Sequence, residues 1–210
     1  MIFFIDIMQN KLKLGILASG SGTNLQAILE ACHNQAIDAE VKIVISDVPT
    51  AKALERAKKF GVPTAVHERR TYPAKQSFEQ AIINDLKKYE IELVCLAGYM
   101  RIIGKDFLNA FENRIINIHP ALLPSFPGLD AQKKAWEYGV KVSGCTVHFV
   151  DEMTDHGPII LQAAVPVLEE DTVETLRERI LKEEHRIYPQ AIQLYAEGRL
   201  TMKGRRVQIK

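Results

Sequence analysis

The chain has 210 residues, 47% of them hydrophobic, which is enough for one domain with a sizeable core. Its 27 basic and 26 acidic side chains leave a net charge of +1, which excludes a general affinity for polyanions such as nucleic acid. The apolar opening, residues 1–8, lacks a basic stretch and is interrupted by Asp6, so it is not predicted to be a signal peptide. No segment approaches membrane-spanning length.

Strands and helices are predicted to alternate through the first half of the chain. Hydrophobic runs at residues 13–18, 41–46, 64–66 and 93–96 have the length of buried strands. Helices are predicted between them at residues 24–33, 51–60 and 74–89. This alternation predicts an α/β fold with a single-domain, Rossmann-like, doubly wound and mostly parallel sheet.

The second half of the chain is predicted to add antiparallel strands to the same sheet. A strand carrying Asn117 and His119 is followed by a Pro-Gly loop and a helix near residues 131–138. Strands are predicted at residues 142–150 and 159–165, and a long helix at residues 172–197, which Pro189 is expected to kink or break. Without a linker or a repeat, one domain is expected.

The strand that ends at Pro120 places two polar side chains on one face. Residues i and i+2 of an extended backbone project to the same side, so Asn117 and His119 can reach one small volume. A neutral donor and a group that titrates near neutrality suit a site that holds a carbonyl oxygen as it becomes an oxyanion. The alternative is a buried histidine satisfied by backbone groups beside a turn-forming asparagine.

An acidic turn, residues 151–158, follows the strand predicted at residues 142–150. Its Asp155 is a candidate to orient His119, and a carboxylate there is expected to raise the His119 pKa above its usual value. Alternatively, Asp155 closes an Asx turn before Gly157. Spacing along the chain leaves both possibilities open.

The glycine-rich segment at residues 19–24 joins the first predicted strand to the first predicted helix, where backbone N–H groups and the helix dipole favour an anion. It is therefore a candidate phosphate site. Leu25 stands where a dinucleotide fingerprint has its third glycine. Asp47 could serve as a ribose-binding acid, so a nicotinamide-binding domain is a weaker interpretation, and a plain helix-capping turn is the simplest one.

Four segments together, residues 19–24, 96–103, 117–124 and 155–162, closely resemble the phosphoribosylglycinamide formyltransferases, the folate-dependent enzymes of purine synthesis. The resemblance extends over about residues 13–202. It implies the formyltransferase fold and transfer of a formyl group from 10-formyltetrahydrofolate, as co-substrate, to the amine of 5'-phosphoribosylglycinamide in de novo purine (IMP) biosynthesis. The reaction would be a direct attack through a tetrahedral intermediate, without a metal.

The same resemblance implies roles for individual residues. The catalytic residues would be Asn117, His119 and Asp155. The ribonucleotide would be bound by Gly22, Thr23, Asn24 and Glu184. The folate pocket would be lined by Lys75, Met100, Arg101, Ile102, Ile103, Asn117, Asp151, Glu152, Met153, Thr154 and Asp155. His148 also looks close to the site.

The chain departs from the pattern of these enzymes in a few places. Asp130 stands where many relatives have histidine, and His156 where glycine is frequent. Residues 1–12 are interpreted as an N-terminal extension, residues 13–202 as the formyltransferase domain and residues 203–210 as a C-terminal tail. The basic residues near that tail are most simply a solvated cluster: Arg199, Lys203, Arg205, Arg206 and Lys210.

Other functions are weaker candidates. Formyltetrahydrofolate deformylases resemble this catalytic core but normally carry an N-terminal regulatory domain, and methionyl-tRNA formyltransferases continue with a further C-terminal domain. A nucleotide-sensing module would leave Asn117, His119 and Asp155 unexplained. The expected partners are small-molecule substrates, with neither nucleic acid nor membrane, and the expected assembly is a monomer or a homodimer. The scattered Cys32, Cys95 and Cys145 are typical of reduced thiols in a cytoplasmic protein.

Overall fold

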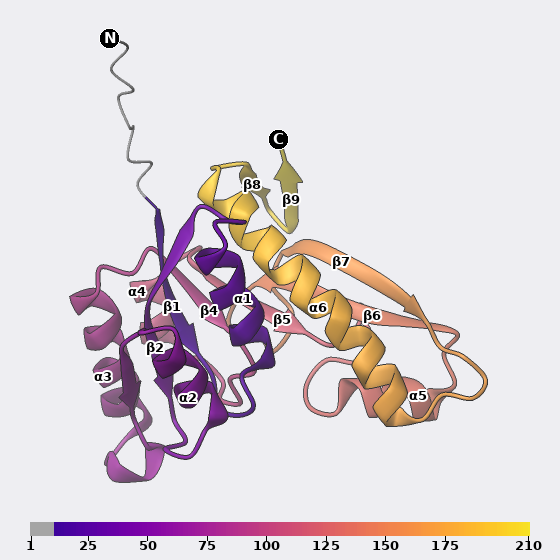
Figure 1. Cartoon of the computed structure of the whole chain (residues 1–210), viewed down its shortest axis with the longest axis horizontal. Coiled ribbons are helices and arrows are strands. Elements are labelled where there is room, and N and C mark those ends of the chain that lie inside the picture. The colour runs from indigo at the N-terminus through magenta and orange to yellow at the C-terminus, as the bar shows by residue number, and fades with distance from the viewer. Residues whose placement is uncertain (1–10) are drawn as a thin grey trace.

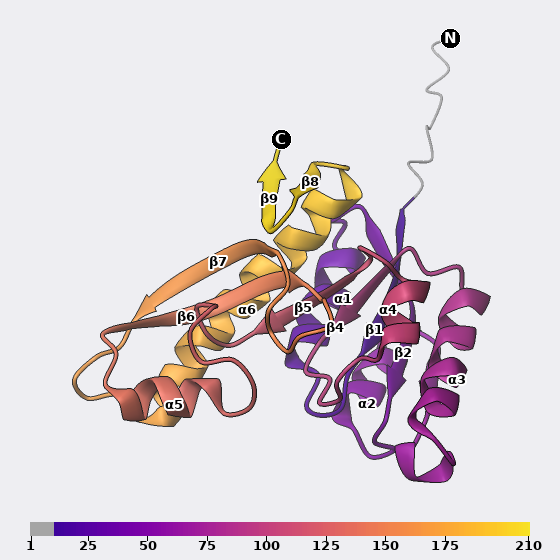
Figure 2. The ribbon, with the colours of Figure 1, turned by 180° about the vertical axis from the view of Figure 1, so that it is seen from behind.

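The structure is a computed structural model and describes residues 11–210. Its core is a single sheet whose strand order is β3-β2-β1-β4-β5-β6-β7-β9-β8. Figures 1 and 2 show this sheet running through the molecule with helices on both sides. The strands are β1 (Leu12–Leu17), β2 (Ala39–Ser46), β3 (Thr64–Val66), β4 (Leu93–Leu96), β5 (Ile115–His119), β6 (Val142–Phe149), β7 (Ile159–Pro166), β8 (Leu200–Lys203) and β9 (Arg206–Ile209).

The neighbouring strands from β3 to β5 in the sheet order are parallel, and the pairing becomes antiparallel beyond β5. There β6 pairs antiparallel to β5, and β7 pairs antiparallel to β6. The predicted parallel half with antiparallel additions is therefore confirmed. Because β1, β2, β4 and β5 point the same way, the loops that follow them meet at one edge of the sheet, where open α/β sheets bind ligands.

Helices cover the two faces of the sheet with separate hydrophobic clusters. Residues of α1 (Thr23–His33), α2 (Lys52–Lys59) and α6 (Val173–Ala196) pack into one cluster, and α3 (Lys75–Lys88) and α4 (Lys105–Ala110) into the other. A shorter helix, α5 (Ala131–Tyr138), packs against α6. Each face of the central strands is thus buried, which explains their continuous apolar sequences.

The long helix α6 continues through Pro189, contrary to the expected kink or break. Pro189 lies inside the helix and is buried beside Tyr188, Ala191 and Ile192. The Tyr188 hydroxyl lies 3.0 Å from the Leu96 carbonyl oxygen and 3.1 Å from that of Ile116. Packing on this scale offsets the hydrogen bond that proline removes from the helix.

Some short elements were not predicted. Helix α4 and the 3-10 turn Arg69–Thr71 have few residues and little periodicity. The C-terminal residues form the hairpin β8–β9, and Arg206 of β9 is in register with Ile159 of β7, so residues 206–209 belong to the sheet and are not a free tail. The predicted extension, residues 1–12, lies mostly outside the described residues, and Leu12 already belongs to β1.

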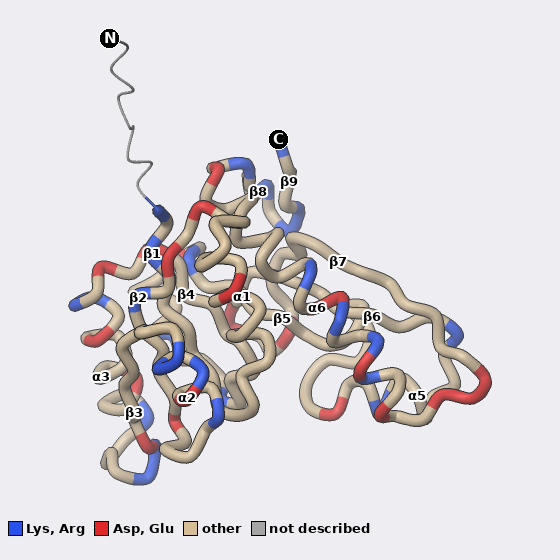
Figure 3. Tube along the Cα trace, viewed as in Figure 1, with Lys and Arg blue, Asp and Glu red and all other residues tan. Residues whose placement is uncertain are grey.

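Charges of both signs are scattered over the molecule in Figure 3, and Lys and Arg are interspersed with Asp and Glu on α6. Between residues 11 and 210, no helix is both long and apolar enough to span a membrane.

Candidate active site

A cavity of about 660 Å³ lies at the carboxyl ends of the central strands. Asn117 and His119 at the end of β5 line one wall. The segments after β4 and after β6 line the others. These segments include most of the residues predicted to face the folate: Met100, Arg101, Ile102, Ile103, Asp151, Glu152, Met153, Thr154 and Asp155.

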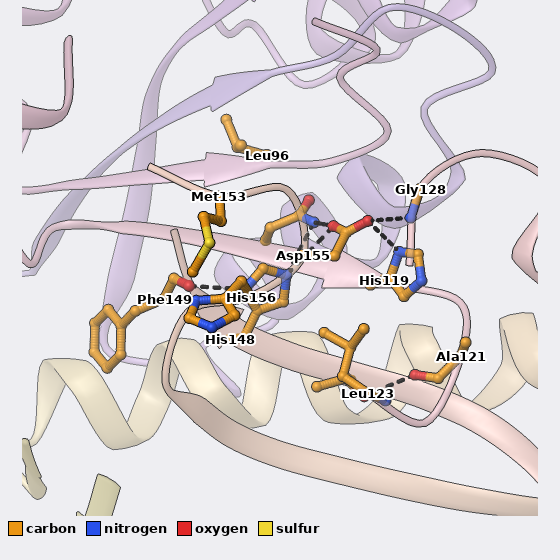
Figure 4. Close-up of polar contacts among 12 residues, drawn as sticks. Leu96, His119, Ala121, Leu123, Gly128, His148, Phe149, Met153, Asp155 and His156 are labelled. Carbon is orange, nitrogen blue, oxygen red and sulfur yellow. Dashed lines mark hydrogen bonds and ion pairs between the residues drawn. The ribbon is translucent and has the colours of Figure 1, made fainter. Parts of the chain in front are cut away.

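The Asp155 carboxylate lies at the centre of a polar network, and Figure 4 shows one of its oxygens joined to both Gly128 and His119. Its Oδ2 accepts a 2.7 Å hydrogen bond from the Gly128 N–H. Asp155 has a left-handed backbone with φ of 51°, a conformation that non-glycine residues adopt mainly in turns held by their surroundings. Directly after this turn, a Cβ on Gly157 would lie 1.8 Å from the Phe149 carbonyl oxygen.

His119 is almost fully buried, and both of its ring nitrogens have neighbours. Nδ1 lies 3.2 Å from Asp155 Oδ2, and Nε2 lies 2.8 Å from the Phe126 carbonyl oxygen. A carbonyl oxygen only accepts, so Nε2 carries a hydrogen. A neutral His119 then turns its Nδ1 lone pair toward the carboxylate, whereas an imidazolium donates to both partners. The ring is therefore poised to take up a proton beside Asp155.

Asn117 and His148 complete the network. The Asn117 amide nitrogen lies 3.2 Å from His148 Nε2 and donates to Asp155 Oδ1 at 3.4 Å. His148 Nδ1 donates to the Phe149 carbonyl oxygen at 2.7 Å, and its ring is 2% exposed. Since β5 and β6 pair Asn117 directly with His148, the sheet register fixes this contact.

Two pKa shifts follow from these surroundings. Burial lowers the pKa of His119 below its usual 6.5, and this effect outweighs the opposing charge of Asp155 and the hydrogen bond to Phe126. The expectation that the His119 pKa lies above its usual value is therefore wrong, because it left burial out. Burial raises the pKa of Asp155, but His148, the Gly128 N–H and the charge of His119 together bring it below its usual range, so Asp155 is a carboxylate near neutral pH.

The glycine loop opens α1 as predicted. Gly22 precedes Thr23, the first residue of α1, with φ of 69°, and no side chain caps this helix end. A Cβ on Gly22 would lie 2.7 Å from the Ala53 Cα, so the loop packs against α2 at a position that only glycine fits. The first N–H groups of α1 remain available to an anion.

Asn24 and Glu184 meet beside this loop. Asn24 Nδ2 donates to Glu184 Oε2 at 2.6 Å, and both side chains are buried. Burial raises the pKa of Glu184, although the hydrogen bond from Asn24 opposes the rise. Among the described residues, the buried polar side-chain atoms without a partner are Asn24 Oδ1 and His185 Nε2. Asn24 lies on α1 and His185 on α6, and neither residue is among those that line the cavity.

The structure does not bring every predicted residue into the site. Lys75 is the first residue of α3, its ammonium lies 3.6 Å from Glu79, and it is not among the residues that line the cavity. Asp47 is engaged by Ser19 and Arg101 through its two carboxylate oxygens, so it does not offer a free acid to a nicotinamide ribose. The dinucleotide-binding interpretation therefore lacks the acid that would bind the ribose.

The C-terminal hairpin reaches the turn that carries Asp155. Arg205, between β8 and β9, donates to the His156 carbonyl oxygen at 2.6 Å and lies 2.8 Å from His156 Nε2. His156 Nδ1 in turn lies 2.8 Å from Asp151 Oδ2. The hairpin therefore braces one wall of the cavity through Arg205, so this residue is not simply part of a solvated cluster as predicted.

Comparisons with known proteins identify the family. A family model described as formyl transferase matches residues 12–192. This chain belongs to the formyl transferase family. The family implies a formyl donor derived from folate, and the cavity next to Asn117, His119 and Asp155 is the place in the fold where the predicted donor-facing residues gather.

Individual relatives agree with this family. The phosphoribosylglycinamide formyltransferase of Bacillus subtilis is 49% identical over 180 residues, which cover 86% of this chain and 92% of the relative. The human trifunctional purine biosynthetic protein adenosine-3 is 45% identical over 190 residues, 90% of this chain but 19% of the relative. The crystal structure of glycinamide ribonucleotide transformylase 1 from Symbiobacterium toebii superposes with a TM-score of 0.95, at 56% identity, over 100% of this chain and 98% of that one.

A deformylase is similar to this chain in fold. The crystal structure of a formyltetrahydrofolate deformylase from Pseudomonas syringae has a TM-score of 0.88 at 24% identity, and the match covers 95% of this chain and 66% of that chain.

Gln132 and Arg177 line the cavity, although no role was predicted for them. Ser21, from the predicted phosphate-binding loop, also belongs to the lining, so the cavity reaches the glycine loop. His148 was noted only as close. Its signal in the sequence is the alternation of β6, in which His148 lies on the same face as Thr146 and is in register with Asn117.

Proposed function

We propose that this chain transfers the formyl group of 10-formyltetrahydrofolate to the amine of 5'-phosphoribosylglycinamide, in de novo purine biosynthesis. The single observation that carries the proposal is the convergence of Asn117, His119 and Asp155 on one wall of the cavity. The names of the relatives, at 45 to 56% identity over most of this chain, support the same substrates.

The cavity suits a folate-type donor. Its volume of about 660 Å³ lies within the range usual for small-molecule pockets. Met100, Ile102 and Met153 are 63%, 65% and 55% exposed, an unusual exposure for apolar side chains that a flat aromatic ligand would cover. Asp155 and the backbone of residues 151–154 supply polar groups on the same side.

The ribonucleotide is proposed to bind between the glycine loop and α6. Its phosphate would accept hydrogen bonds from the first N–H groups of α1, after Gly22, where the helix dipole also favours negative charge. Glu184 and the orphaned Oδ1 of Asn24 would accept hydrogen bonds from the ribose hydroxyls. Ser21 lines the donor cavity, so the two substrates would meet at the end of the glycine loop.

Catalysis then follows from the polar network. Attack of the amine on the formyl carbon places negative charge on the formyl oxygen, and Asn117 and the His119 imidazolium stabilise that charge as donors. To do so, His119 leaves either Phe126 or Asp155, the two partners it has in this structure. Growing negative charge beside the ring favours its protonated form, which offsets the lowered pKa.

Asp155 has the complementary role. Its lowered pKa keeps it ionised, so it can accept the proton that the attacking amine loses, directly or through a water molecule. The proton that Asp155 accepts is then passed, directly or through the same water molecule, to the leaving nitrogen of the folate as the carbon–nitrogen bond breaks, so the number of protons balances. Holding both substrates in adjacent pockets supplies the orientation that the direct transfer needs.

A formyl-transfer assay with two acceptors tests this function. Purified protein is incubated with 10-formyltetrahydrofolate, with and without 5'-phosphoribosylglycinamide, and formylated ribonucleotide and formate are quantified. With 5'-phosphoribosylglycinamide present, formylated ribonucleotide is expected as the main product. Without 5'-phosphoribosylglycinamide, little formate is expected. Formate release that ignores the ribonucleotide would identify a hydrolase and overturn the proposal.

A further inference from the structure

The buried carboxylate of Asp47 has no part in the chemistry described above. Asp47 directly follows β2, at the edge of the sheet where the site lies, and is 8% exposed. A buried carboxylate is costly unless it is paired and hydrogen-bonded. Its two oxygens have separate partners. Ser19 Oγ donates to Oδ1 at 2.6 Å, and Arg101 Nε donates to Oδ2 at 2.6 Å.

The two partners belong to two different walls of the site. Ser19 opens the glycine loop that leads to α1, and Arg101 lies in the segment after β4 that lines the donor cavity. The segments also touch directly, because the Met100 N–H donates to Ser19 Oγ at 3.0 Å and the Ser19 N–H donates to the Gly98 carbonyl oxygen at 3.0 Å. Asp47 is thus the charged centre of a contact between the two loops.

In this contact, a fixed carboxylate is hydrogen-bonded to two loops at once. The Asp47 side chain is 4% exposed and held by its strand, whereas Arg101 is 41% exposed on a segment without regular structure. Charge-assisted hydrogen bonds to a fixed carboxylate restrict both loops at the same time. When one ligand orders its loop, the other loop therefore also loses conformational entropy. The second ligand then has a smaller entropy cost to bind.

We propose that Asp47 is a positioning residue that couples the ribonucleotide site to the folate site, so that binding of one substrate tightens binding of the other. The inference rests on the proposed function. Coupling between two ligands is reciprocal, so each must change the affinity for the other by the same factor.

The test measures that factor by calorimetry. The dissociation constant of 5'-phosphoribosylglycinamide is determined with and without saturating tetrahydrofolate, which lacks the formyl group and cannot react. In the wild type, tetrahydrofolate is expected to tighten ribonucleotide binding by about five-fold or more. In Asp47→Asn, which keeps the shape but turns an amide toward Arg101, the factor is expected to fall below about two-fold.

Two further variants keep the test decisive. Arg101→Met removes the exposed partner and should lose the coupling in the same way, even if Asp47→Asn fails to fold. Asp106→Asn, which neutralises an exposed carboxylate paired with Gln76, is the matched control and should keep the wild-type factor. Circular dichroism and thermal melting report folding.

The outcomes separate the inference from the proposed function. A wild type that binds both ligands without coupling would overturn the inference, and so would unchanged coupling in Asp47→Asn or in a folded Arg101→Met. A wild type that binds neither ligand would contradict the proposed function itself.

Discussion

His119 Nδ1 lies 3.2 Å from Asp155 Oδ2, although His119 ends β5 and Asp155 lies in the turn after β6. The histidine is only 4% exposed. Because Nε2 donates to Phe126, the only proton that this pair can exchange lies between these two atoms. The protonation of His119 and that of Asp155 therefore depend on each other, and removing either side chain changes the pKa of the other.

Asp155→Asn is expected to lower turnover by roughly a hundred- to ten-thousand-fold, the range typical of general acid–base groups. His119→Ala should have a comparable effect, and the double variant should be little worse than the worse single one, because residues that act as a unit are not additive. Steady-state kinetics of the three variants measure this. Losses that multiply in the double variant would show that the two residues act independently.

The pKa of His119 is expected to lie below its usual 6.5, and Asp155→Asn should lower it further. The direction of this pKa change follows from two opposing effects on the His119 ring. Burial lowers the pKa and is the larger effect, while the Asp155 charge raises it, so removing that charge leaves burial less opposed. An NMR titration of the His119 ring in both proteins measures the shift. A value above 6.5 in the wild type would contradict the effect of burial.

Glu184→Gln is expected to raise the KM for the ribonucleotide by about ten- to a hundred-fold, since hydrogen bonds to a charged group contribute about 1.5–3 kcal/mol. The KM for the folate donor should stay within about two-fold. Glu183→Gln is the matched control, because Glu183 is the neighbouring acid on α6 and pairs with Arg186 at the surface. A Glu184 variant that affected only the folate KM would reverse the assignment of the two pockets.

Gly22→Ala is expected to destabilise the protein by about 1–3 kcal/mol, because a non-glycine residue is strained at φ of 69° and its Cβ would clash with Ala53. Gly20→Ala is the control, since no atom lies within 4 Å of a Cβ placed there. Urea unfolding monitored by circular dichroism compares the two. Equal stabilities would show that the glycine loop does not require its left-handed residue.

Arg205→Ala is expected to raise the KM for the folate donor by about two- to five-fold and to leave that for the ribonucleotide unchanged. The contact with His156 braces the cavity wall, but an exposed interaction contributes little energy. Arg206→Ala, an exposed neighbour in β9, should behave like the wild type. A larger effect of the control would point to the hairpin's folding instead of this contact.

Local patterns in the sequence were sufficient for the architecture and for part of the site. The alternation of apolar runs with helical segments predicted the parallel strands β1, β2 and β4, because burial on both faces leaves a readable apolar run. The spacing of Asn117 and His119 predicted a shared face because strand geometry is local. The glycine loop before α1 was predicted for the same reason.

Only the tertiary structure decided which distant groups meet. Asn117 and Asp155 are 38 positions apart in the chain, and their contact depends on the register of β6 against β5 and on the left-handed turn at Asp155. The direction of the His119 pKa shift depends on burial, which no neighbouring residue in the sequence reveals. The strands of the hairpin β8–β9 alternate apolar and polar residues, but each has only four residues, too short a pattern to predict a strand on its own. In the folded protein the free edge of β7 gives the backbone of this hairpin a partner.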